Sequence, residues 1–359
     1  MKIAVLGGGN GSYAAAADLT ENGHEIRFWR RNAAAFGPLL ETATIELRDA
    51  AGTRDVKIAM VTDDLGKAVT GAELILLPTP AFSQIDVAKA LAPFLTDGQV
   101  IFLPPGTFGS FAMMKALREA GCNADIAIAE TGTLPYLTRK KGATGVAITV
   151  RAVRLPTGVF PASKTDYACE VIARAYPVIH PIEDALSAAL MNGGPIIHPP
   201  LILMNAGPLE HFEAWDIHNE GTQPSVRLVT DRLDNERIAI REALGYKPYH
   251  YPLRDTYSSD RWMYGDTHQV LVDSGDWREK IDLKSHRYMT EDVHFGLAFM
   301  VSVADWLGLP APVASGMLAM SSAICDRELR EGERTLEALG LSGLDRDAMT
   351  KLLAEGLSA

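Results

Sequence analysis

The chain has 359 residues, of which 47% are hydrophobic, and its formal net charge is −11. This length exceeds one ordinary domain, so we expect two domains with a sizeable core, and the negative charge argues against nucleic-acid or membrane-surface binding. The three cysteines, Cys122, Cys169 and Cys325, lie too far apart for an evident zinc site or disulfide framework, which fits a reducing cytoplasm. No signal peptide or membrane span is expected.

Short apolar runs alternate with helical patterns along the first half of the chain. Runs without polar alternation predict strands buried on both faces, as in a mostly parallel sheet with helices on each side. Residues 45–58 hold Ala51 and Gly52 between two alternating runs and predict an inserted hairpin. The expected strands are residues 2–6, 25–29, 74–77, 100–103, 125–129 and 146–150, and the expected helices are residues 12–22, 83–95 and 108–120.

The first expected strand runs directly into a glycine-rich turn and an alanine-rich helix. Gly7 permits a tight turn, Gly9 lets a pyrophosphate approach the backbone, and Ser12 is small enough for the helix to pack against the strand. Free N–H groups and the dipole at the helix start attract phosphates. We therefore predict a Rossmann-type dinucleotide site, and the alternative is a plain glycine turn. The expected cofactor contacts are Gly7, Gly9, Asn10, Gly11 and Ser12.

The second expected strand ends at Trp29 and is followed by Arg30 and Arg31, where an NAD-binding fold usually places an acid. A guanidinium pairs with a 2′-phosphate, whereas an acid repels it. Because a charge-assisted hydrogen bond is worth about 1.5–3 kcal/mol, we expect NADP(H) to be preferred, with NAD(H) as the alternative cofactor. The other interpretation is that both arginines are solvated charges at the end of the strand.

Three loops follow expected strands, at residues 78–81, 104–107 and 130–133. Ligands of open α/β sheets collect at the carboxyl ends of the strands. We therefore expect Pro78, Thr79 and Glu130 to lie on the nicotinamide side of the cofactor site, with structural turns as the alternative.

Strand-like runs become rare after about residue 183. Residues 225–244 place their apolar side chains on one helical face before Gly245, and the same spacing recurs after Pro312. We predict an α/β fold with a doubly wound, Rossmann-type dinucleotide-binding domain over residues 1–183. A mainly α-helical substrate and catalytic domain follows over residues 184–359.

Reduction of a carbonyl or an imine needs a nearby proton donor, and an orienting carboxylate helps. Residues 189–207 offer His198 in an apolar context, with Asn192 shortly before it. A satisfied core histidine is the more common interpretation of such a position on sequence alone.

Residues 285–308 form the second candidate stretch. Arg287 is suited to clamp a carboxylate, and Glu291 and Asp292 precede a long apolar run. Acids in the first turn of a helix also serve as caps, so capping is the alternative. His286 and His294 are nearby candidates, and spacing alone does not decide among them.

Several segments together resemble the opine dehydrogenase family, the octopine/nopaline dehydrogenase group. The resemblance covers nearly the whole chain and rests on GGGNGSYAAAADL, PPGTFGS, AETGTLPYLTR, MNGGPIIHPPLILMNAG, RYMTEDVHFGL and EGERTLEALGLSGL. It implies a dinucleotide domain followed by a helical domain. It also implies an oxidoreductase acting on a CH–NH bond, which condenses an amino acid with an α-keto acid such as pyruvate and reduces the resulting imine.

The resemblance also suggests roles for individual residues. The family's catalytic histidine falls on His198 and its partner aspartate on Asp292, while Arg287 matches an arginine available for a substrate carboxylate. Asn192 matches a polar position of the same motif, with substrate binding as its expected role. A related bacterial enzyme has an aspartate where this chain has Arg30, which agrees with the expected preference for NADP(H).

Two other function classes stay open. A glycerol-3-phosphate or ketopantoate type of NADP reductase would use a catalytic lysine, for which Lys280 and Lys284 are candidates, and a non-enzymatic NADP(H)-binding regulator would use none. We expect an amino acid and an α-keto acid as small-molecule partners, no nucleic acid, no membrane and no metal, and a homodimer is one option for the oligomeric state. The aromatic candidates for a substrate pocket are Tyr136, Trp215 and Trp262.

Overall fold

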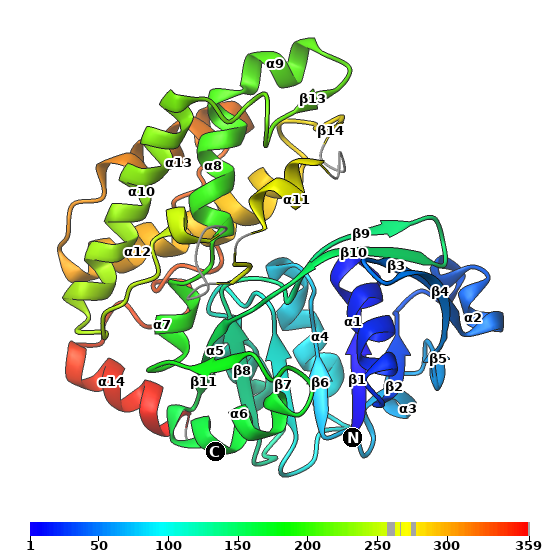
Figure 1. The fold of residues 1–359 in the computed structure, drawn as a ribbon. Helices are drawn as coiled ribbons and strands as arrows, with labels where there is room; N and C mark the ends of the chain where they lie inside the picture. Colours follow the sequence, from blue (N-terminus) through cyan, green and yellow to red (C-terminus); the bar gives the residue numbers. More distant parts are fainter. Residues whose placement is uncertain (257–262, 266, 274–277, 358–359) are drawn as a thin grey trace. The chain divides into compact units, whose positions relative to one another are not determined.

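The computed structural model describes residues 1–256, 263–265, 267–273 and 278–357. The chain divides into two compact units, the first formed by residues 1–189 with 351–359 and the second by residues 190–350. Figure 1 shows a strand-rich first unit and a mainly helical second unit, as the sequence predicts.

An eight-stranded sheet forms the centre of the first unit, in the order β12-β11-β8-β7-β6-β1-β2-β5. Every pairing is parallel except β11 with β8. The chain leaves β1 to one side and later returns to its other side at β6, which creates the crevice where such folds bind nucleotides. The strands are β1 (Lys2–Leu6), β2 (Glu25–Trp29), β5 (Met60–Thr62), β6 (Leu74–Leu76), β7 (Val100–Leu103), β8 (Ala127–Thr131), β11 (Leu155–Phe160) and β12 (Ile179–Pro181).

Helices accompany this sheet. The alanine run of α1 leaves almost no side chain beyond Cβ, so the helix packs closely, and residues 14–17 are all buried. The helices are α1 (Asn10–Glu21), α2 (Leu39–Thr42), α3 (Leu65–Val69), α4 (Gln84–Leu91), α5 (Gly109–Glu119), α6 (Thr165–Ala173) and α7 (Ala185–Ala189), with single turns η1 (Ala33–Phe36), η2 (Ala81–Ser83) and η3 (Ala162–Lys164).

A second sheet of four strands, in the order β4-β3-β10-β9, packs against α1. The predicted hairpin is confirmed as β3 (Thr44–Asp49) with β4 (Gly52–Lys57), and it pairs with β10 (Gly145–Arg151), which pairs with β9 (Tyr136–Lys141). The expectation that residues 146–150 join the parallel sheet is wrong. Because α1 covers the second sheet, β10 is mostly buried, and its apolar run does not reveal which sheet it joins.

Ion pairs fasten this second sheet to α1. The Arg54 guanidinium of β4 pairs with Glu21 at 2.5 Å and with Asp49 at 2.8 Å, and Arg151 of β10 pairs with Asp18 and Asp49, both at 2.7 Å. The hydrogen bond from Arg54, with that from Arg151, holds the pKa of the Asp49 carboxyl far below its usual value. Asp49 therefore holds Arg54 and Arg151 in place, and these two arginines connect the strands to α1.

The unit boundary differs from the predicted one. Residues 184–189 belong to the first unit because Gly158 of β11 leaves room for α7, where a Cβ would lie 1.9 Å from the carbonyl oxygen of Asp184. Residues 351–359 also join the first unit, and a Cβ on Gly356 would lie 3.1 Å from the ring of Pro161. Hydrophobic periodicity predicts neither the contact of Gly158 with Asp184 nor that of Gly356 with Pro161.

The second unit is mainly helical, and the helices predicted over residues 225–244 and after Pro312 are confirmed. Within the described ranges, no helix is long and apolar enough to cross a membrane. The elements are α8 (Gly194–Met204), α9 (Ala206–His211), α10 (Pro224–Ala243), η4 (Leu253–Asp255), α11 (His268–Asp273), η5 (Tyr288–Leu297), α12 (Ala298–Leu307) and α13 (Pro312–Cys325), a short pairing of β13 (Trp215–Asp216) with β14 (Arg278–Glu279), and α14 (Arg346–Glu355), which crosses the unit boundary.

Candidate active site

The glycine-rich turn has the geometry that a nucleotide phosphate requires. Gly7 has a φ of +123°, and a Cβ there would lie 2.7 Å from Ser12 Oγ and 2.9 Å from Thr79 Cγ2. Gly9, the residue before α1, faces open space and supplies no side chain to cap the helix. The first N–H groups of α1 are therefore available to an anion.

The neighbouring residues divide between packing and binding. Ser12 is fully buried, as its predicted packing role requires, and a Cβ on Gly11 would lie 3.2 Å from Pro78. Thr79 Oγ1 is buried without a hydrogen-bond partner in the described part of the chain. A polar ligand group beside the glycine-rich turn would satisfy this hydroxyl, so the residues present fit a dinucleotide.

Arg30 lies across the glycine-rich turn. A Cβ on Gly8 would lie 2.5 Å from Arg30 Nε, and Arg30 Nη1 donates to the carbonyl oxygen of Ala35 at 2.5 Å. Arg31 is exposed. The guanidinium of Arg30 is thus held at the end of β2, where the fold places the adenosine ribose.

Glu130 occupies a different place from the one expected. It is fully buried, and its two carboxylate oxygens accept hydrogen bonds from the backbone N–H groups of Phe108 and Ser110, each at 2.8 Å. These bonds hold a loop in which Thr107 and Phe108 have positive φ. A Cβ on Gly106 of this loop would lie 2.4 Å from the Cβ of Glu130, so only glycine fits there. Both carboxylate oxygens of Glu130 are thus engaged by backbone N–H groups, and the observed role of Glu130 is to fix this loop.

In the second unit, His198 of α8 and Asp292 of η5 form a direct pair. His198 Nδ1 lies 2.7 Å from Asp292 Oδ2, and the two side chains are 15% and 4% exposed. Asp292 therefore does not cap a helix, which was the alternative at the sequence level. Because the carboxylate takes Nδ1, Nε2 is the ring nitrogen that remains for another hydrogen-bond partner.

Close helix packing creates this pair. A Cβ on Gly194 of α8 would lie 2.1 Å from Asp292 Oδ1, and one on Gly296 of η5 would lie 2.0 Å from the ring of Pro195. The η5 segment is a π-helix, a form often found at functional sites. Both glycines are needed for the two helices to approach this closely.

Two further side chains complete the cluster, and sequence reasoning missed both. The Tyr288 ring stacks on the imidazole of His198, with centroids 3.7 Å apart and an interplanar angle of 11°. Its hydroxyl oxygen lies 2.7 Å from His218 Nε2. The only sequence signal was the position of Tyr288 beside Arg287 in a candidate stretch. His198 is therefore fixed by Asp292 at its edge and by Tyr288 on its face.

The two predicted substrate-binding residues differ in accessibility. The Arg287 side chain is 50% exposed, with Nη2 3.6 Å from Glu291 Oε2, so it is open to a carboxylate. Asn192 is 7% exposed, and its Oδ1 accepts a hydrogen bond from the backbone N–H of Gly194 at 3.0 Å. The observed contact of Asn192 shapes the start of α8, which differs from its expected role.

The other candidates lie elsewhere. Tyr136 is buried in the first unit, where its hydroxyl donates to Asp18 at 3.0 Å. Trp215 donates to Asn205 at 3.0 Å, and Trp262 lies outside the described residues.

The lysine and histidine candidates lie in the second unit. Lys280 donates to the carbonyl oxygen of Phe212, and both Lys280 and Lys284 are exposed. His286 packs edge-on against the Tyr288 ring at 4.4 Å, and burial, with the charge of Arg327, lowers the pKa of His294.

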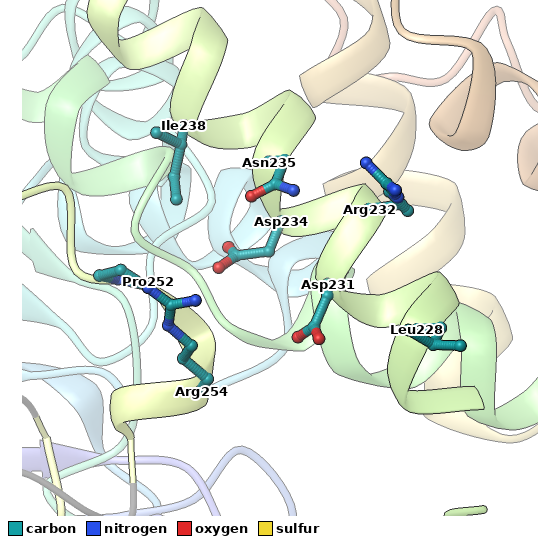
Figure 2. Close-up of a pocket in the computed structure, with 8 residues that line it drawn as sticks. All are labelled: Leu228, Asp231, Arg232, Asp234, Asn235, Ile238, Pro252 and Arg254. Atoms are coloured by element: carbon teal, nitrogen blue, oxygen red, sulfur yellow. The ribbon is translucent and has the colours of Figure 1, made fainter. Parts of the chain in front are cut away.

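Figure 2 shows a hollow in the second unit, on the surface of α10 and the segment around η4. None of the predicted site residues lines it, so we assign it no part in the chemistry. Its lining side chains are Leu228, Asp231, Arg232, Asp234, Asn235, Ile238, Pro252 and Arg254.

Known proteins identify the family. A model described as "NAD/NADP octopine/nopaline dehydrogenase, alpha-helical domain" matches residues 181–325, and one described as "NAD-dependent glycerol-3-phosphate dehydrogenase N-terminus" matches residues 2–118. An octopine dehydrogenase solved with NADH and agmatine has a TM-score of 0.74 at 17% identity and covers 100% of this chain and 99% of its own. A yersinopine dehydrogenase with bound NADP+ has a TM-score of 0.66 at 18% identity, with coverage of 99% and 98%.

These folds confirm the predicted architecture. Among sequence relatives, an opine dehydrogenase from Arthrobacter sp. (strain 1C) is 30% identical over 354 residues, which cover 95% of each chain. This protein therefore belongs to the opine dehydrogenase family of NAD(P)-dependent oxidoreductases.

Proposed function

We propose that this enzyme condenses an amino acid with an α-keto acid and reduces the product with NADPH, using His198 and Asp292 for proton transfer. The observation that carries the proposal is the 2.7 Å contact between His198 Nδ1 and Asp292 Oδ2, both largely buried. The amine adds to the carbonyl and water leaves to form an imine. With a dinucleotide bound through its pyrophosphate at Gly7–Ser12, the nicotinamide would supply a hydride to the imine carbon; together with a proton on the nitrogen, this would yield a secondary amine.

The chain's own residues account for binding and proton transfer. Nε2 of His198 protonates the departing oxygen as water is lost, and Asp292 stabilises the imidazolium and keeps Nδ1 as a donor. Arg287 holds a substrate carboxylate through two parallel hydrogen bonds. Tyr288 restricts the imidazole to one plane, so that Nε2 keeps one direction.

The preference for NADP(H) is a second part of the proposal. Arg30 lies across Gly8 at the end of β2, with its guanidinium placed for a 2′-phosphate. Structural relatives occur with NADH and with NADP+, so the family fold accepts either cofactor and Arg30 is the local feature that favours NADP(H). We also expect a cytoplasmic enzyme, because its three free cysteines fit a reducing compartment, and a homodimer stays an open expectation.

Variants of the pair test the mechanism. His198→Ala and Asp292→Asn should each lower turnover with both substrates by at least about 10²-fold, the low end of acid–base contributions. Binding of NADPH should stay within about twofold, since neither residue belongs to the glycine-rich turn. Near-normal turnover in both variants would refute the assignment.

The ratio of KM values for NADPH and NADH tests the cofactor preference. Arg30→Asp should raise the KM for NADPH relative to the KM for NADH by about tenfold or more, because it replaces a charge that attracts the 2′-phosphate by one that repels it. An unchanged ratio excludes Arg30 as the determinant.

A further inference from the structure

A lysine from the second sheet lies beside the glycine-rich turn. The backbone N–H of Lys140, in β9, donates to Asn10 Oδ1 at 2.9 Å. The strands β9 and β10 form a hairpin, and the Tyr13 hydroxyl of α1 donates to the carbonyl oxygen of Ala143, in the turn of this hairpin, at 2.9 Å. Two hydrogen bonds thus fasten the hairpin to the start of α1, and they fix the place from which the Lys140 side chain extends.

The Lys140 ammonium is held over an aromatic ring, since its Nζ lies 4.1 Å from the centroid of the Tyr13 ring. Lys140 is half-buried, and burial, with the positive charge of Arg30, lowers the pKa of its ammonium. The charge of Arg30 also acts on Tyr13, where it opposes the rise in pKa that burial causes. Arg30 lies against Gly8, and Lys140 lies beside Asn10 and over the Tyr13 ring, so both cations are next to the glycine-rich turn.

These two cations repel one another in the absence of an anion. Among the ion pairs of the described residues, neither Arg30 nor Lys140 has a carboxylate partner. A phosphate monoester carries close to two negative charges near neutral pH and has three acceptor oxygens. It can accept hydrogen bonds from a guanidinium and an ammonium together, and its negative charge offsets the repulsion between the two cations.

We propose that Lys140 is the second cation of a 2′-phosphate subsite, in which it and Arg30 both bind the phosphate. This inference rests on the proposed preference for NADP(H). Lys140 is then a specificity residue that the hairpin brings to the cofactor, far in sequence from the glycine-rich turn. There are two competing interpretations: Lys140 only packs on Tyr13, or it contacts the pyrophosphate. Neither of these roles depends on the 2′-phosphate.

Calorimetric affinities for 2′,5′-ADP and for 5′-AMP separate these interpretations, because the two ligands differ only in the 2′-phosphate. Lys140→Met keeps an apolar, polarisable side chain against the Tyr13 ring while it removes the charge. It should weaken 2′,5′-ADP about tenfold or more and leave 5′-AMP within about twofold. Lys141→Met, the adjacent exposed lysine, is the matched control and should change neither affinity.

Each remaining outcome has a separate meaning. If Lys140→Met weakens both ligands equally, or neither, the subsite lacks Lys140 and the inference fails, while a loss of 2′,5′-ADP preference in Arg30→Met still upholds the cofactor preference. If the unmodified enzyme binds both ligands equally well, the NADP(H) preference itself fails and the subsite fails with it. Lys140→Arg should restore most of the lost affinity, since it restores the charge.

Discussion

Gly194 is the residue whose substitution connects helix packing most directly to the chemistry. An alanine Cβ there would lie 2.1 Å from Asp292 Oδ1, whereas ordinary van der Waals contact begins at 3.4 Å. Either the carboxylate or the start of α8 must therefore move by about 1 Å, and the other carboxylate oxygen is the one that contacts His198. Misplacing a catalytic group by about 1 Å can cost about 10²-fold in rate, so we expect Gly194→Ala to lower kcat by that factor.

The chain contains a matched control. Gly193 directly precedes α8, and a Cβ there would meet nothing closer than 3.7 Å, so Gly193→Ala should keep full activity and gain up to about 1 kcal/mol of stability. Both variants should bind 2′,5′-ADP normally, because that site lies in the first unit. Thermal unfolding establishes that each variant is folded, and kcat is then measured with both substrates saturating. A folded Gly194→Ala variant with a kcat within about twofold of Gly193→Ala would refute the reasoning.

Three further predictions concern other side chains of the two units. Tyr288→Phe keeps the ring that stacks on His198 and should retain kcat within about threefold, whereas Tyr288→Leu removes it and should lower kcat about tenfold; equal losses would instead implicate the hydroxyl. Arg287→Gln should raise the KM for one carboxylate substrate about tenfold or more, and unchanged KM values for both substrates would exclude the clamp. Asp49→Asn should lower the free energy of unfolding at pH 7 by about 2–3 kcal/mol, against less than about 1 kcal/mol for Glu73→Gln in an exposed pair. Because the folded-state pKa of Asp49 is depressed, its contribution is present above pH 4 or so and is lost as the pH falls, so the gap between Asp49→Asn and the unmodified protein should narrow in denaturant titrations at acidic pH; a constant gap would contradict the pairing.

The cofactor turn was predictable because its determinants are local. Gly7, Gly9 and Ser12 act within one strand–turn–helix unit, and Arg30 follows directly at the end of the next strand. The central strands were predictable for a related reason, since burial on both faces leaves an unbroken apolar run.

The pairing of His198 with Asp292 was only partly predictable. His198 and Asp292 are 94 residues apart, so their roles came from resemblance to a family and not from spacing. The stacking of Tyr288 and the close approach at Gly194 depend on how two helices pack, and neither periodicity nor composition records that packing. The position of Glu130 after a strand predicts a cofactor contact, whereas its carboxylate accepts hydrogen bonds from backbone N–H groups in the structure.

The central claim is that this enzyme joins two substrates before it reduces them. The most direct measurement follows NADPH oxidation with an α-keto acid alone, an amino acid alone and both together, with the product identified by mass. We predict oxidation only with both substrates, and a product whose mass equals their sum less one water plus two hydrogens. Rapid oxidation with the keto acid alone, yielding a hydroxy acid, would contradict the account.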